Sequence, residues 1–262
     1  MFKKVVVLIV GYIKWIYLIP IGCIHYVIDI VQYMKKIKEE IPPPCKIRGI
    51  IPIILDRYKP AGSIDSHYFL QDIYVAKRVM QEKPITHFDV GSRVDGFISH
   101  LLAGLEGEVT IIDVRPLLVK IEHLNFIQAN ATDLKEIEDN SIESLSSLHA
   151  VEHFGLGRYG DDIDPKACFT AMRSLQRVVK KNGKLYFSVP IGRINAVYFN
   201  SHRIFKAQSI LNVFDEMELV EFAYIHNYQI KTIDGKEAIH LIQNKVIPIA
   251  NYDCGIFVFR KK

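Results

Sequence analysis

Two histidines and a glutamate lie close together in the stretch SIESLSSLHAVEHF. His149, Glu152 and His153 follow the strand predicted over residues 142–148. Histidine has a pKa near neutral, so such a side chain can remove a proton from a substrate hydroxyl. His202, in FNSHRIF, follows a later predicted strand and belongs to the same edge of a parallel sheet. We predict that these four residues form a site that removes protons.

The spacing of these residues also matches H-x-x-E-H, the inverted zinc-protease motif. That motif needs a helix, so that both histidines share one face and bind the metal. Here the residues follow a strand and lead into the glycine-rich GLGRYG. The four cysteines are far apart and form no CxxC pair. We therefore predict no metal site and no disulfide framework.

A second chemical signal is the stretch THFDVGSRVDGFISHLLAGLEGEVTIIDV, residues 86–114. It reads as strand, glycine-bearing turn, helix and strand, the first unit of a nucleotide-binding α/β domain. Gly91 lets the chain turn sharply, Gly96 lets the helix approach the sheet, and Asp113 can accept the hydroxyls of a ribose. The turn lacks the middle glycine of G-x-G-x-x-G, and Phe97 stands where a Walker loop needs lysine. A nicotinamide-dependent oxidoreductase is disfavoured on this ground.

Alternating strands and helices must position these residues. The predicted helices are 67–81, 94–105, 165–181 and 206–214; the predicted strands are 86–90, 109–114, 125–131, 142–148, 184–189, 219–225 and 255–260. This alternation predicts an α/β fold with a mostly parallel, doubly wound sheet over residues 67–262. In such a sheet a ligand binds beyond the carboxyl ends of the strands, where the chemical residues lie.

Five motifs in order resemble the class I S-adenosylmethionine-dependent methyltransferases over residues 86–226. They are DVGSRVDG, IIDV, QANATDL, SIESLSSLHAVEHF and LQRVVKKNGKLYFSVP. The stretch HYFLQDIYVAKRV…HFDVGSRVDGFISHLL also resembles a domain-of-unknown-function branch of this superfamily. The resemblance implies a Rossmann-like methyltransferase fold with an antiparallel last strand, and S-adenosylmethionine as the cofactor.

The resemblance also implies which residues act. Those expected to bind the cofactor are Asp89, Gly91, Ser92, Gly96, Asp113, Asn130, Asp133 and His149. The family usually has an acid where this chain has Asn130, so Asp133 or the Asn130 amide would contact the adenine. Catalysis would fall to His149, Glu152, His153 and His202. The expected reaction is methyl transfer to a hydroxyl of a saccharide or other small polar acceptor. The alternative, which the missing acid favours, is a catalytically inactive scaffold at the membrane in surface-glycan assembly.

The N-terminal segment differs in composition from the rest of the chain. Residues 5–28 are almost entirely apolar, and as a helix they would reach roughly 36 Å, enough to cross a bilayer. Lys14 and Pro20 stand against a clean span. We prefer a membrane-associated helical segment over residues 1–41, contacting the membrane through residues 1–34. A helix packed on the main domain and a signal peptide are the alternatives.

The remaining bounds concern the linker, the charge and the compartment. The stretch IPPPC opens a linker over residues 42–66. A net charge of +4 is too small to predict nucleic-acid binding. We expect a cytoplasmic protein at the inner face of the membrane.

Overall fold

The computed structural model describes residues 2–39, 50–58, 66–250 and 252–262. The chain divides into two compact units, residues 1–64 and residues 65–262. We refer to them as the N-terminal unit and the α/β unit, and describe each by itself. Most of the predicted linker, 42–66, lies outside the described residues.

The α/β unit is built on one eight-stranded sheet with the order β3-β2-β1-β4-β5-β10-β8-β9. The strands are β1 Thr86–Val90, β2 Glu108–Asp113, β3 Leu124–Gln128, β4 Ile142–Leu148, β5 Val179–Ile191, β8 Met217–His226, β9 Gln229–Asp234 and β10 Asp253–Lys261. The strands from β3 to β5 in this sheet order pair in parallel, whereas β10 runs antiparallel to both β5 and β8. The predicted mostly parallel sheet with an antiparallel last strand is confirmed.

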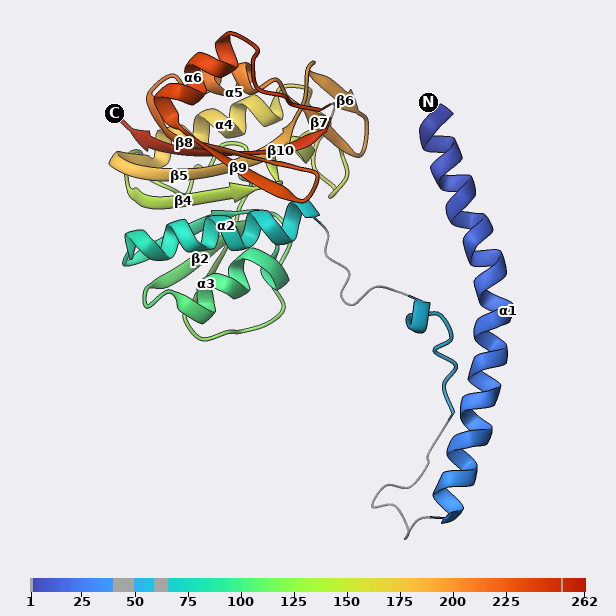
Figure 1. Ribbon diagram of the computed structural model, residues 1–262. Helices are drawn as coiled ribbons and strands as arrows, with labels where there is room; N and C mark the ends of the chain where they lie inside the picture. The colour runs from blue at the N-terminus through green and yellow to red at the C-terminus, as the bar shows by residue number, and fades with distance from the viewer. Residues whose placement is uncertain (1, 40–49, 59–65, 251) are drawn as a thin grey trace. The chain divides into compact units, whose positions relative to one another are not determined.

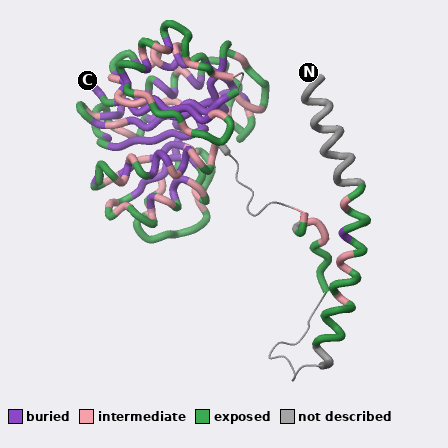
Figure 2. Tube along the Cα trace, viewed as in Figure 1, coloured by how far each residue is buried: buried purple, intermediate pink, exposed green. Residues whose placement is uncertain are grey.

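Helices cover both faces of the sheet (Figure 1). One face carries α2 Ser66–Glu82, the π-helical turn η2 Val94–Ile98 and α3 Ser99–Gly104; the other carries α4 Ala167–Val178, α5 Ala207–Val213 and α6 Gly235–Gln243. Figure 2 shows the buried residues concentrated in the strands between these layers. Strands covered on both faces are apolar along their length, as β5 is over its last seven residues, which are all buried.

Aromatic rings join the antiparallel strand to its neighbours. Phe257 of β10 lies 4.9 Å from Phe222 of β8 and 6.5 Å from Phe187 of β5, measured between ring centroids. All three side chains are fully buried. Burial of such rings contributes several kcal/mol in total, so β10 is held between its neighbours by packing as well as by backbone hydrogen bonds.

Several elements were not predicted from the sequence. They are the edge strand β9, the helix α6, the 3-10 turn η3 Val151–His153, and a separate hairpin of β6 Ala196–Tyr198 and β7 His202–Ile204. The predicted helix 165–181 ends earlier, at Val178, and β5 starts directly after it and runs through Asn182 and Gly183. Asn182 has φ of +64°, and the pairing of β5 with β4 shifts at this irregularity.

The N-terminal unit consists of one long helix and a short return segment. Helix α1 spans Phe2–Glu39 and continues through Pro20, so the predicted apolar helical segment is confirmed. Its stretch 17–36 is long and apolar enough to cross a membrane, by length and composition alone. The return segment, residues 50–58, ends in the 3-10 turn η1 Asp56–Tyr58.

Candidate functional site

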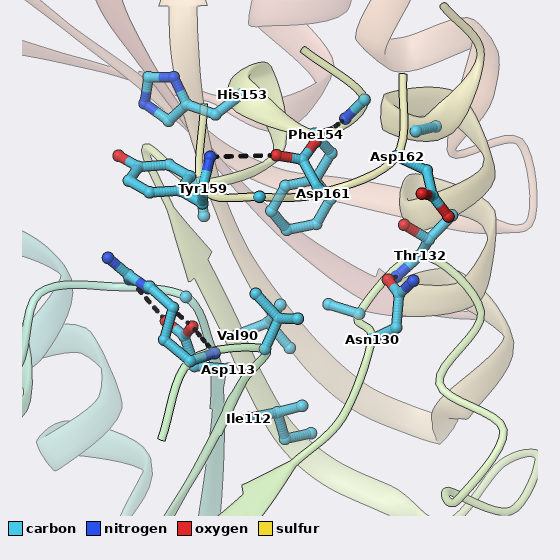
Figure 3. A pocket seen from close by; sticks show the side chains of 18 of the residues that line it. Val90, Ile112, Asp113, Asn130, Thr132, His153, Phe154, Tyr159, Asp161 and Asp162 are labelled. Carbon is cyan, nitrogen blue, oxygen red and sulfur yellow. Dashed lines mark hydrogen bonds and ion pairs between the residues drawn. The ribbon is translucent and has the colours of Figure 1, made fainter. Parts of the chain in front are cut away.

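A cavity of about 470 Å³ opens at the carboxyl ends of β1, β2 and β4 (Figure 3). Its apolar wall is formed by Val90, Ile112, Ala131 and Phe154. We call it the first cavity. A second cavity of about 570 Å³ shares six lining residues with the first, so the two adjoin. The shared residues are Gly91, Asp113, Arg115, His149, His153 and Tyr159.

Gly91 lies in the turn after β1 and borders both cavities. Its φ is +70°, and a Cβ on it would lie 3.0 Å from the Ala150 Cβ. A side chain here would be strained and would fill the space between β1 and the loop after β4. The predicted role of Gly91, a sharp turn beside the ligand, is compatible with this position.

Asp89 and Ser92 hold that turn from beneath. The Asp89 carboxylate is fully buried and accepts hydrogen bonds from the Ser92 amide (2.9 Å), the Ser92 hydroxyl (2.6 Å) and the Ser146 hydroxyl (2.5 Å). The Leu148 amide donates to the Ser92 hydroxyl at 3.1 Å. Ser92 borders the second cavity, but Asp89 borders neither. Asp89 therefore positions the turn and is placed too deep to contact a ligand.

Two other residues predicted to bind a cofactor also lie outside both cavities. A Cβ on Gly96 would come 2.4 Å from an Asp72 carboxylate oxygen, so Gly96 lets η2 pack against α2. The Asp133 carboxylate pairs with the Lys135 ammonium at 2.8 Å. Asn130, by contrast, borders the first cavity, and its side-chain oxygen accepts a hydrogen bond from the Thr132 amide.

Asp113 lies at the rim shared by the cavities, and its carboxylate is already bound. Its oxygens accept hydrogen bonds from the Arg115 amide (2.8 Å), Nε (3.0 Å) and Nη2 (2.7 Å), drawn as dashed lines in Figure 3. The Arg115 guanidinium also lies over the Tyr159 ring, 4.6 Å from its centroid. Sequence reasoning placed Asp113 but missed Arg115, although it follows only two residues later.

The loop 155–161 brings Tyr159 to the cavity. One Asp161 oxygen accepts a hydrogen bond from the Gly155 amide (2.6 Å) and the other accepts one from the Tyr159 amide (3.2 Å). The Tyr159 ring then packs edge-on against His153, with 5.8 Å between the ring centroids. Four carboxylates, those of Asp113, Asp161, Asp162 and Asp164, border the first cavity, so its lining carries an excess of negative charge over Arg115 and His149.

His149 and Glu152 form a buried pair rather than an open catalytic group. The His149 Nδ1 lies 2.7 Å from Glu152 Oε1, and the two side chains are only 2% and 1% exposed. Burial lowers the pKa of His149, but the Cys254 and Glu152 side chains beside it outweigh burial and raise that pKa. A histidine that keeps its proton at neutral pH is a poor base. We infer that this pair holds the chain after β4, where His149 has φ of +50°.

His153 has the properties of a base. Its Nδ1 donates a hydrogen bond to the Ser201 carbonyl oxygen at 2.5 Å, which leaves Nε2 as the acceptor nitrogen. Burial lowers the pKa of His153 and outweighs the opposing effect of Glu152. The ring is therefore neutral at physiological pH. It borders both cavities, so the structure brings it together with Gly91 and Asp113.

His202 lies beyond Ser201 and borders neither cavity. Its Nδ1 is 2.8 Å from the Ser201 hydroxyl, and its ring stacks on Tyr198 at 5.1 Å. On its other side the Tyr252 ring lies 5.3 Å away. His202 thus belongs to a row of aromatic rings that starts at the β6–β7 hairpin, and its predicted catalytic role stays a prediction.

The family comparison identifies the chain by sequence. The profile of a family described as Caenorhabditis protein of unknown function, DUF268, matches residues 108–248, more than half of the chain. The chain belongs to the DUF268 family. The matched region runs from β2 to the loop before β10 and includes Asp113, Arg115, His153 and Tyr159. No curated protein matches this DUF268 chain.

Solved structures share its fold at low sequence identity. The [4+2]-cyclase SpnF is 15% identical, with 73% of this chain and 80% of that chain covered and a TM-score of 0.52. The 1,6-didemethyltoxoflavin-N1-methyltransferase of Burkholderia thailandensis, solved with S-adenosylhomocysteine, is 13% identical, with 78% and 93% covered and a TM-score of 0.49. NodS of Bradyrhizobium japonicum WM9, an N-methyltransferase also solved with S-adenosylhomocysteine, is 14% identical, with 80% and 91% covered and a TM-score of 0.47.

These likenesses concern the fold. The DUF268 chain has the fold of the class I S-adenosylmethionine-dependent methyltransferases, as its sequence predicted. A cyclase among the similar structures illustrates that this fold carries more than one activity, so activity must be argued from the site.

Asp89→Asn should change how stability depends on pH. Burial raises the pKa of Asp89 to about 6 from 3.8, so between these values the folded protein binds the proton more tightly than the unfolded chain. The free energy of unfolding should therefore fall as pH rises through this window, by about 3 kcal/mol in wild type. The neutral asparagine should remove that slope. Urea unfolding at both ends of the window measures it.

The matched control for this measurement is Asp162→Asn, which changes an exposed aspartate of the same site. It should keep the wild-type slope. Equal slopes in wild type and Asp89→Asn would contradict the assignment of the raised pKa to Asp89.

Proposed function

We propose that the protein transfers a methyl group from S-adenosylmethionine to a hydroxyl of a saccharide or other small polar acceptor. The observation that carries the proposal is the first cavity itself. It joins the Gly91 turn, the Asp113 carboxylate and a neutral His153 at the carboxyl ends of β1, β2 and β4. A volume of about 470 Å³ is in the range of small-molecule sites.

The lining of the cavity fits this cofactor chemically. Its apolar wall of Val90, Ile112 and Phe154 suits an adenine ring, and the Asn130 amide lies on the same side. Asp113 would accept the ribose hydroxyls once Arg115 releases it. The excess of aspartates favours a ligand with a positive sulfonium. When bound, S-adenosylmethionine supplies an electrophilic methyl group.

His153 would remove the proton from the acceptor hydroxyl. Its Nε2 carries the free lone pair because Nδ1 is committed to the Ser201 carbonyl. The same hydrogen bond fixes the orientation of the ring. Tyr159 packs against His153 and helps to exclude water from this side of the cavity.

A row of rings supports a polyhydroxyl acceptor. The His202 ring centroid lies 5.1 Å from that of Tyr198 and 5.3 Å from that of Tyr252, and Ser201 connects His202 to His153. Flat ring faces suit the apolar faces of sugar rings, and the neighbouring polar atoms suit their hydroxyls. We propose that the acceptor enters along this row.

The second candidate is the catalytically inactive scaffold. The ion pair of Asp113 with Arg115 favours it, because the carboxylate that a ribose needs is already satisfied. For either candidate we propose that the N-terminal unit attaches the protein to the inner face of the membrane. The apolar stretch 17–36 supports this attachment.

Asp113→Asn tests cofactor binding. The neutral amide loses charge-assisted hydrogen bonds to hydroxyl groups, which should weaken binding of S-adenosylhomocysteine by about 10- to 100-fold. Calorimetry on the full chain measures the dissociation constant. Asp133→Asn is the matched control and should bind as wild type does, because Asp133 pairs with Lys135 outside the cavity. Absence of binding by wild type would overturn the proposal and favour the scaffold.

Arg115→Ala tests the ion pair from the other side. Arg115 competes with the ribose for Asp113, so its removal should raise the affinity for S-adenosylhomocysteine severalfold. Arg260→Ala, which breaks an exposed pair with Glu218, should leave the affinity unchanged. A weaker affinity in Arg115→Ala would mean that Arg115 itself binds the ligand.

His153→Gln tests the base. The rate of methyl transfer should fall by about 10²- to 10⁴-fold, with little change in affinity for S-adenosylhomocysteine. Because the pKa of His153 is lowered from 6.5, the wild-type rate should be constant above that pH and fall as Nε2 takes up a proton below it. The readout is formation of S-adenosylhomocysteine with polyhydroxyl acceptors. His202→Gln is the comparison, and a rate unchanged in His153→Gln would rule out this base.

A further inference from the structure

Helix α1 has one face that the return segment covers. The backbone at Gly22 lies against Ile54, and a Cβ on Gly22 would come 2.6 Å from the Ile54 carbonyl oxygen. Nearby, the His25 Nδ1 lies 2.6 Å from the Tyr58 hydroxyl, and Arg57 donates to the Asp29 carboxylate at 2.6 Å. Spacings of three and four residues place Gly22, His25 and Asp29 on one face of the helix.

A second face of the described part of α1 is apolar and exposed. It carries a stripe at spacings of four and three residues, formed by Tyr17, Ile21, Ile24, Ile28 and Val31, whose exposed fractions run from 43% to 67%. Each residue advances a helix by about 100°, so Ile24 points about 200° away from Gly22. Within the described residues of α1, the positions that the return segment contacts and the apolar stripe are therefore centred roughly 110° apart around the helix.

The covered face is incompatible with a helix that spans the bilayer through this stretch. Residues 50–55 lie beside α1 with almost no regular secondary structure, so their backbone groups would lack partners in hydrocarbon. The Asp29–Arg57 ion pair would also lie within the apolar stretch 17–36. At 38 residues α1 reaches about 57 Å, nearly twice the thickness of a bilayer core.

We propose that α1 lies in the plane of an anionic membrane surface, with its apolar stripe toward the acyl chains and the return segment toward water. This deepens the membrane attachment of the proposed function and does not depend on methyl transfer. Charge complementarity supports an anionic surface, since exposed Lys35 and Lys36 follow the stripe directly. Residues 1–41 hold six lysines against three acids.

The width of the apolar surface favours a membrane over a second copy of the helix. A two-helix coiled coil needs only a narrow seam. Here further large apolar side chains are exposed around the stripe, namely Ile19, Val27, Tyr33 and Met34. A broad apolar face with cations beside it matches a helix that lies in the headgroup region.

The test uses the full-length protein and two kinds of vesicle, phosphatidylcholine alone and phosphatidylcholine with phosphatidylserine. We expect the protein to float with the anionic vesicles and to bind the neutral vesicles more weakly. Alkaline carbonate should release the bound protein from the vesicles. Ile28→Lys should weaken binding by at least about tenfold, because it places a charge in the apolar stripe. The matched control, Ile51→Lys, makes the same replacement on the return segment, where the side chain is 77% exposed, and should bind at least as well as wild type.

Each other outcome overturns the proposal in a distinct way. Protein that resists carbonate extraction would be a spanning helix. Alternatively, the protein could bind neither kind of vesicle and form a dimer, detected by light scattering, that Ile28→Lys abolishes. The stripe would then bind a second copy of the chain. Binding of S-adenosylhomocysteine by Ile28→Lys, compared with wild type, reports separately on the α/β unit and on whether the variant is folded.

Discussion

The buried carboxylate of Asp89 is the interaction on which the site depends. It binds the amide and hydroxyl of Ser92 and the hydroxyl of Ser146, and so ties the turn after β1 to the neighbouring strand β4. Gly91, between them in the chain, is thereby held with positive φ against Ala150. An acid placed in the core costs free energy through desolvation, which its raised pKa reflects. The three hydrogen bonds offset that cost and hold the turn after β1, which borders the cavity, in one conformation.

The polar groups that line the cavity are also hydrogen-bonded to other protein groups. Arg115 satisfies Asp113, Asp161 satisfies the amides of the loop 155–161, and Ser201 orients His153. A ligand would exchange its own contacts for some of these. The affinity of the site would therefore depend on the difference between the two sets of contacts, the Asp113–Arg115 pair among them.

The two units differ in how far their apolar side chains are buried. In the α/β unit, aromatic residues such as Phe257 are enclosed between β5, β8 and the helices. In the N-terminal unit, the stripe from Tyr17 to Val31 is exposed, although another face of the helix packs against the return segment. An exposed apolar surface of this extent is stable only when something covers it, which is the physical reason for assigning it a partner.

The sequence by itself determined the succession of strands β1 to β5 along the chain and the residues that follow those strands, whereas the antiparallel closing strand was implied by the resemblance to the class I methyltransferases. Gly91, Asp113 and His153 could be placed because the carboxyl ends of parallel strands meet at one edge. The edge strand β9 and helix α6 were missed because both segments are short and their positions are set by packing on β8. Tertiary structure alone decided which predicted residues reach the cavity.

The same limit applies to the roles of individual side chains. His149 and His153 are equivalent in the sequence motif, but one is buried against Glu152 and the other is turned by the carbonyl of Ser201, 48 residues later. The Cys254 and Glu152 side chains raise the pKa of His149, whereas burial lowers the pKa of His153 against the opposing effects of Glu152 and the Ser201 carbonyl. Residue type and spacing thus determined where the chemistry lies. Contacts between distant segments decided which groups can carry it out, because burial and hydrogen bonding set both protonation and orientation.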